Sequence, residues 1–181
     1  REAMKFYNKT RIPDKLLAPV LVEAGRAVGA RTADTVVKVT QGQYHLRGSQ
    51  HGSNGFHPLR WHLERCKPEH RGDLIPSDGG WIELTIPTLG GRGPWGWTDP
   101  LELAENIYAM AAHEWSHVKD TQDRVHNDRS LYALHHDNRP WEKRAKSRTK
   151  KAERHLTDKR QDAIIALALA LEETYSPAGA D

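Results

Sequence analysis

The sequence predicts one α+β domain, on three observations. Its 181 residues are 37% hydrophobic and 28% charged, which supplies enough apolar surface for one compact core but not for two. Residues Trp81–Ile86 alternate apolar and polar side chains, as a half-buried strand does. Two longer segments, Asp14–Gly29 and Pro100–Gln122, carry apolar residues at helical spacing. We therefore expect a single domain over residues 1–181, with its core in about residues 13–145.

The first half of the chain is predicted to hold one helix and a small twisted sheet. The N-terminal helix spans Asp14–Gly29, where the glycine is a stop signal. Strands are predicted at Thr35–Gln41, which is rich in β-branched residues, and at Leu59–Leu63, which alternates. A connection rich in Gly, Ser and His joins these two strands. The third strand is Trp81–Ile86, which ends at Pro87.

The second half is predicted to be helical. Residues 89–100 hold four glycines and two prolines and form a loop. Asp99 then caps a helix that has Pro100 at its first position and runs to about Gln122. After a polar connection, Pro140 begins a C-terminal helix that we expect to continue over about residues 140–173.

The charges are unevenly distributed along the chain. The 27 Lys and Arg against 24 Asp and Glu give a net charge of +3, too small for a protein whose whole surface binds polyanions. Residues 73–138, however, sum to 4 − 11 = −7, and residues 139–160 sum to 10 − 3 = +7. A helix with this basic charge could face the phosphates of a nucleic acid. Alternatively it is a solvated face that pairs with the acidic middle segment.

Cysteine content and hydropathy exclude several classes of protein. Cys66 is the only cysteine, so an intrachain disulfide and a cysteine-based zinc site are excluded, and His and carboxylate groups must hold any metal. The longest apolar run, Ala163–Leu171, has nine residues, well short of the roughly 20 that span a bilayer. We expect no membrane partner and a cytoplasmic location, although the chain starts at Arg1 and could be trimmed. The oligomeric state stays open.

The predicted central helix contains the motif His113-Glu114-Trp115-Ser116-His117. Histidines four residues apart lie one above the other on a helix face, so both imidazoles can reach one ion. Glu114 lies about one helical step round, where its carboxylate can reach a water on the metal. This is the position of a general base.

A catalytic zinc takes three protein ligands, and the third must lie elsewhere in the chain. In the metzincin pattern a glycine stands three residues after the second histidine and a ligand six residues after it. Those positions are Asp120 and Asp123 in this chain, so the glycine that ends the helix is missing. The other candidates downstream of His117 are His126, Asp128, His135, His136, Asp137 and Glu142.

The segment Arg139-Pro140-Trp141-Glu142-Lys143-Arg144-Ala145 has a glutamate in the first turn of the predicted helix and an alanine three residues later. It resembles the Glu-x-x-Ala glutamate helix of the gluzincin branch of zincin metallopeptidases, especially the compact minigluzincins. The resemblance covers Trp81 to about Ala145, and it departs from thermolysin-like members, which have an Asp where Lys146 stands. It implies a zincin-like domain in which His113, His117 and Glu142 hold Zn²⁺ and Glu114 is the catalytic base.

Two further sets of residues are candidates for the site. SprT-like zincins take a third histidine from the region after the motif helix, so His135 or His136 remains an alternative to Glu142. If Glu142 is the ligand, then His135, His136, Arg139 or Tyr132 could stabilise the oxyanion.

In zincins the strand before the motif helix forms the rim along which an extended substrate pairs. The resemblance therefore assigns this role to Trp81–Ile86, with Trp81, Glu83 and Thr85 as candidate rim residues. The alternative is a core strand with ordinary alternation.

The expected function is zinc-dependent hydrolysis of a peptide or protein substrate. One alternative is a SprT-like protease that acts on DNA-bound proteins, with the basic helix 139–160 as its anchor. Another is a regulatory protease of a phage or mobile element. The third is a non-catalytic structural or binding subunit of a larger assembly, in which zinc only staples two helices.

Overall fold

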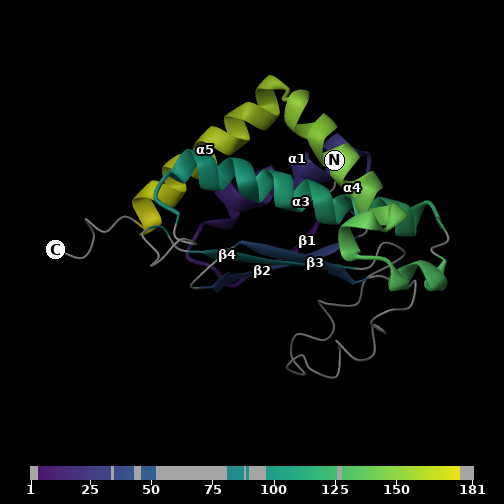
Figure 1. Cartoon of the computed structure of the whole chain (residues 1–181). Helices are drawn as coiled ribbons and strands as arrows, with labels where there is room; N and C mark the ends of the chain where they lie inside the picture. The colour runs from purple at the N-terminus through teal and green to yellow at the C-terminus, as the bar shows by residue number, and fades with distance from the viewer. Residues whose placement is uncertain are drawn as a thin grey trace.

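A four-stranded sheet covered by helices forms the body of the protein in a computed structural model that describes residues 4–33, 35–42, 46–51, 81–87, 89, 97–125 and 128–175 (Figure 1). The described residues are α+β, as the sequence predicts. In chain order the elements are β1 (Lys5–Asn8), α1 (Asp14–Val28), β2 (Val36–Gly42), β3 (Arg47–His51), β4 (Trp81–Pro87), α3 (Pro100–Gln122), the 3₁₀ turns η2 (Arg129–Ala133) and η3 (His136–Asn138), α4 (Pro140–Arg154) and α5 (Asp158–Tyr175).

The strands of the sheet lie in the order β1-β2-β4-β3. β1, β2 and β4 are parallel, and β3 pairs with β4 in the antiparallel direction. Val37 of β2 lies opposite Ile82 of β4, and Gly48 of β3 lies opposite Leu84. Among the described residues β3 is therefore an edge strand, and β4 is enclosed between two neighbours.

The core lies between the sheet and the helices. α1 and α3 cover one face of the sheet, and α4 and α5 lie on α3 from the other side (Figure 1). Ile82, Leu84 and Ile86 of β4 are fully buried against these helices. The indole of Trp115 on α3 donates a hydrogen bond to the Leu21 carbonyl of α1 over 2.9 Å. The motif helix is thus held in the centre of the molecule, between the sheet and the C-terminal helices.

The predicted ends of the first two helices are confirmed. α1 stops at Gly29, which has φ of 81° and ψ of 19°, a left-handed conformation that favours glycine. α3 starts after Asp99, whose Oδ1 accepts hydrogen bonds from the backbone N–H groups of Leu101 and Glu102 over 2.9 and 3.3 Å. Pro100 occupies the first turn, where it costs no backbone hydrogen bond.

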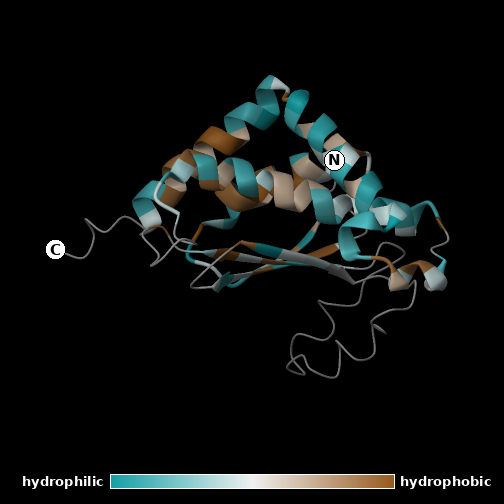
Figure 2. Ribbon diagram, in the orientation of Figure 1, coloured by the Kyte–Doolittle hydropathy of each residue, from teal (hydrophilic) through white to brown (hydrophobic). Residues whose placement is uncertain are grey.

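The prediction of one continuous helix over residues 140–173 is wrong. α4 ends at Arg154, His155 leaves helical geometry with ψ of 57°, and α5 begins at Asp158. Thr157 starts the second helix: its hydroxyl accepts from the Arg160 N–H over 3.3 Å. The break lets α5 turn back and bury Ile164, Leu167 and Leu171 in the core, which a straight extension of α4 would carry away from it. Figure 2 shows the contrast between the hydrophilic α4 and the more hydrophobic α5.

The sheet also differs from the prediction. β1 was not expected, and β3 is a strand where a Gly-, Ser- and His-rich connection was predicted. The predicted strand Leu59–Leu63 lies outside the described residues. Neither β1 nor β3 has regular apolar alternation, because each is a short strand at the side of the sheet and pairs with one described neighbour only.

None of the helices that the structure describes is both long and apolar enough to cross a membrane.

Candidate metal centre

The two motif histidines lie one turn apart on α3. Their ring centroids are 5.0 Å apart and their planes are nearly perpendicular, at 84°. The helix is regular here because the neighbouring Ala111, Ala112 and Val118 are buried in the core. The side chains of His113 and His117 keep 28% and 13% of their surface exposed, so both imidazoles lie at the boundary between core and solvent.

Glu142 reaches both histidines from the first turn of α4. Its Oε2 lies 3.0 Å from His113 Nε2, and its Oε1 lies 3.1 Å from His117 Nε2. Pro140 is in the first turn of the helix, and the fully buried Ala145 leaves room for α3 to approach. Within the described residues these three side chains form a potential metal-binding group, with one ligand atom from each and all of these atoms within 4.8 Å of one another.

The contact between Glu142 and His113 shifts the pKa values of these two residues. Burial alone would raise the pKa of the Glu142 carboxyl, but hydrogen bonds and charge from His113 and His117 hold that pKa well below its usual range. The hydrogen bond to Glu142 raises the pKa of His113 against the opposing effect of burial, and the charge of Glu114 adds to the increase. Glu142 is therefore ionised at neutral pH and ready to ligate.

Glu114, the predicted base, lies between α3 and the edge strand. It is buried, with a relative exposure of 6%. A Cβ atom on Gly48 of β3 would come within 2.9 Å of Glu114 Cγ, so the backbone of β3 passes directly beside the stem of this side chain. Glu114 thus lies on the same turn of α3 as His113 and His117, the two histidines of the metal-binding group.

The candidate oxyanion residues divide into two groups. His136 is the one that joins the cluster: its Nε2 lies 3.2 Å from Glu142 Oε1, and its Nδ1 lies 3.2 Å from Asp137 Oδ1. His135 instead accepts a hydrogen bond at Nδ1 from the Asp137 N–H over 3.3 Å, within the turn η3.

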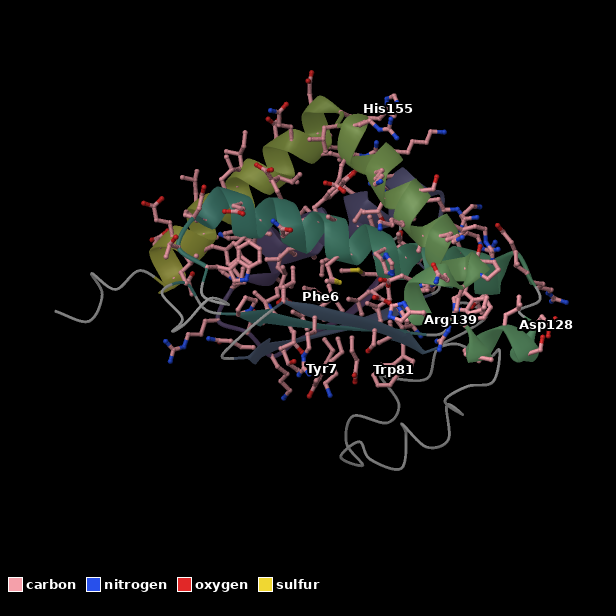
Figure 3. The ribbon with its side chains drawn as sticks, viewed as in Figure 1. Phe6, Tyr7, Trp81, Asp128, Arg139 and His155 are labelled. Atoms are coloured by element: carbon pink, nitrogen blue, oxygen red, sulfur yellow. The ribbon has the colours of Figure 1, made fainter. Side chains whose placement is uncertain are left out.

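Arg139 and Tyr132 brace the connection that leads into α4. The Arg139 guanidinium donates to the carbonyls of Leu134 and Tyr132 over 3.3 and 3.1 Å and lies 5.0 Å from the Tyr132 ring centroid. The Tyr132 ring packs on Trp141, with centroids 4.8 Å apart. These contacts hold the start of α4, and with it Glu142, at a fixed place. Figure 3 labels Arg139, which directly precedes α4.

The structure places the alternative acidic ligands elsewhere. Asp123 caps the end of α3 and pairs with Lys119 Nζ over 2.9 Å, a contact that lowers the pKa of its carboxyl. Asp120 is buried and binds two arginines of α4: Oδ1 lies 2.8 Å from Arg148, and Oδ2 lies 3.0 Å from Arg144. The candidate ligand His126 lies outside the described residues.

The individual ion pairs of Asp120 with Arg144 and Arg148, which we call the Asp120 network, were not predicted from the sequence. Arg148 NH1 also donates to Ser116 Oγ over 3.0 Å and to the Ser116 carbonyl over 3.2 Å, so it links α4 to the middle of the motif. The available signal was the basic segment beside an acidic one, which predicted intramolecular pairing. The spacing of Arg144 and Arg148, four residues apart on one helix, places both on the face that meets Asp120.

The prediction that β4 forms the rim with which an extended substrate pairs is wrong. β2 and β3 occupy both edges of β4, so its backbone cannot pair with a substrate. Trp81, Glu83 and Thr85 lie on the face opposite the buried Ile82 and Leu84, and Figure 3 shows Trp81 below the sheet, away from the helices. Thr85 Oγ1 lies 3.3 Å from Thr40 Oγ1, a contact within the sheet. Among the described residues, the edge of the sheet beside α3 is formed by β3.

The residues present fit a zinc ion in donor type and number. Two imidazole nitrogens and one carboxylate oxygen converge, and this set matches catalytic zinc sites, which keep a fourth position for water. The buried Ala145 and the Arg139 contacts position the group without a metal. Comparisons of the chain with protein-family models, with curated proteins and with solved structures find no match.

Proposed function

We propose that the protein is a zincin-like, zinc-dependent metallopeptidase. The observation that carries the proposal is the convergence of His113, His117 and Glu142 from two helices, with Glu114 on the same turn as the two histidines. The topology agrees with this function, because a described edge strand, β3, lies beside the motif helix and could pair with an extended peptide.

Each residue has a role in the proposed reaction. His113, His117 and Glu142 would hold the ion, which lowers the pKa of a bound water toward about 7 and polarises the scissile carbonyl. Glu114 accepts the proton of the attacking water as the new C–O bond forms. It then passes that proton to the leaving amine nitrogen as the C–N bond breaks. His136, which is exposed beside Glu142, is the residue best placed to donate to the oxyanion.

The site favours catalysis over a zinc staple. Structural zinc sites are closed by four protein ligands, whereas the group here has three among the residues that the structure describes. His113 keeps 28% of its side-chain surface exposed, so a substrate could reach the centre. A structural site also has no use for a carboxylate such as Glu114 beside the ligands.

The test combines metal content with turnover. The purified protein should contain close to one zinc per chain, and chelation should lower its thermal stability, since the site ties α3 to α4. Cleavage of a proteome-derived peptide library, followed by mass spectrometry, identifies a substrate. Glu114→Gln should keep the zinc and the fold but lose at least ~10²-fold in turnover of that substrate.

Three results would contradict the proposal. A folded protein that cannot be loaded with zinc excludes the zincin assignment. Turnover by Glu114→Gln at the parent rate excludes Glu114 as the base. Stoichiometric zinc with no cleavage of any library peptide favours the zinc staple.

A further inference from the structure

The structure accounts for each of the ten basic residues in 139–160. Five of them contact a carboxylate or an aromatic ring of the protein. Arg144 and Arg148 bind Asp120, Lys159 and Arg160 lie 3.4 and 3.5 Å from the carboxylate of Glu23, and Arg139 covers Tyr132. Half of the charge that the sequence shows is therefore neutralised or held within the protein.

The other five cations are exposed and form one surface, which we call the α4 lysine face. It consists of Lys143, Lys146, Lys150, Lys151 and Arg154. In the part of the chain that the structure describes, no ion pair involves any of these five side chains. At 3.6 residues per turn they fall within an arc of about 140°, and they extend over about 17 Å of helix.

The opposite side of α4 explains why these charges point outward. Trp141, Glu142, Ala145 and Ala152 are buried, and they fix the rotation of the helix on α3. The lysine face is therefore held by the core in one orientation. Figure 2 shows α4 as a mostly hydrophilic helix at the surface of the molecule, and Figure 3 marks its far end at His155.

We propose that the α4 lysine face binds the phosphate backbone of a double-stranded nucleic acid. Lysine is a flexible point charge that suits phosphates without reading bases. Single strands are bound with exposed aromatic side chains that stack on bases, and Trp141, the aromatic residue of α4, is buried. Membrane-surface helices combine basic residues with exposed large apolar ones, and α4 exposes none. The composition of this face thus favours a duplex over a single strand or a lipid surface.

The position of the face relates it to the metal centre. Lys143 follows Glu142 directly, and Lys146 lies one turn further along the same helix. A duplex on this face would hold the metal centre close to proteins bound to the same nucleic acid. The binding itself does not depend on the proposed peptidase activity, because it requires neither Glu114 nor turnover.

The experiment measures binding of the full chain to fluorescein-labelled 20-base-pair duplexes by anisotropy, between 50 and 200 mM salt. Five phosphate contacts give a slope of log K against log salt of about −4.5, which is a loss of roughly 500-fold over this range. Two unrelated DNA sequences should bind equally. A duplex RNA of the same length distinguishes DNA from RNA as the source of the phosphates.

The variant Lys143→Gln, Lys146→Gln, Lys150→Gln keeps helix-forming residues and removes three of the charges. Its slope should fall to about −2, so that it loses only about 10-fold between 50 and 200 mM salt. The matched control is Lys9→Gln, Arg11→Gln, Lys15→Gln, which removes three exposed charges around the start of α1 and should keep most of the parent slope.

Three results would overturn the proposal: no duplex binding at 50 mM salt, equal losses in the variant and the control, or binding to vesicles containing phosphatidylserine in place of the duplex. Preservation of zinc content and thermal stability in both variants shows that any loss arises from the surface. Because peptide cleavage is not measured, failure of this proposal leaves the proposed peptidase function untouched.

Discussion

Gly48 of β3 lies against Glu114 of α3 so closely that a Cβ atom at position 48 would be 2.9 Å from Glu114 Cγ. The same atom would be 3.0 Å from Cγ and Sδ of Met110. Gly48 faces α3 because it pairs with Leu84, whose side chain is buried on that side of the sheet. The missing side chain at position 48 therefore leaves the space that the stem of Glu114 occupies.

Gly48→Ala should displace the Glu114 carboxylate while leaving the metal ligands in place. We expect zinc content to stay near one per chain and kcat to fall at least ~10-fold with a smaller change in KM, because a shift of about 1 Å in a catalytic group can cost up to 10²-fold. The measurement is steady-state kinetics on the substrate found with the peptide library, together with metal analysis.

Gly42→Ala is the matched control for this prediction. A Cβ atom there would lie 2.6 Å from Thr85 Cγ2, so the substitution is at least as crowded, but within the sheet. We expect it to lower thermal stability and to leave kcat unchanged. Equal losses of kcat in the two variants would show that Gly48 acts on stability alone.

The sequence predicted the elements that carry their own local signals. α1, β4 and α3 were found because each has regular apolar spacing or a cap, such as Asp99 with Pro100. β3 was missed because Arg47–His51 is a polar segment with glycine in place of an inward apolar side chain. The break between α4 and α5 was missed because His155–Thr157 contains neither Gly nor Pro. It is tertiary packing of α5 on the core that requires it.

At the site, local spacing and long-range pairing were predictable to different degrees. The i, i+4 relation of His113 and His117 follows from helix geometry alone, and the structure places Glu142 beside them, although its role as a ligand stays a prediction. The contacts of Asp120 with Arg144 and Arg148, and of Gly48 with Glu114, join segments distant in sequence. Their pairing depends on how α4 and β3 pack on α3, which no periodicity encodes.

The third ligand can be decided by substitution. Glu142→Ala should weaken zinc affinity at least ~10-fold, because it removes a group that contacts both His113 and His117, at 3.0 and 3.1 Å. The double change His135→Ala, His136→Ala should keep zinc bound and slow turnover, since His136 touches Glu142 from an exposed position. Competition with a chromogenic chelator measures both affinities. Zinc lost with the histidines and kept without Glu142 would favour the SprT-like type.

The ion pairs of Asp120 predict that replacing this residue lowers the unfolding free energy much more than replacing Asp123, three residues later. Asp120→Ala leaves two half-buried arginines without their carboxylate and should cost about 3 kcal/mol of unfolding free energy. Asp123→Ala removes an exposed pair with Lys119 and should cost less than about 1 kcal/mol. Urea denaturation of the zinc-free proteins measures both values. Equal costs would mean that the Asp120 network contributes no more than a surface pair.

Zinc affinity should depend on pH through His113. The hydrogen bond to Glu142, supported by the charges of Glu114 and Asp137, raises the pKa of His113 in the metal-free protein despite burial. Because zinc takes a neutral imidazole, the ion must displace the proton that His113 holds below this raised pKa. Affinity should therefore be constant above that pKa and fall by up to about tenfold per pH unit below it. Glu142 adds no proton over this range, since its pKa is held well below the usual value.

Calorimetry in two buffers of different ionisation enthalpy, between pH 5.5 and 8, should show more protons released at the acid end. The Glu142→Gln variant replaces the carboxylate whose hydrogen bond and charge raise the pKa of His113 with a neutral amide, so its proton release should begin at a lower pH. Affinity that does not change between pH 5.5 and 8 would contradict the His113–Glu142 pairing.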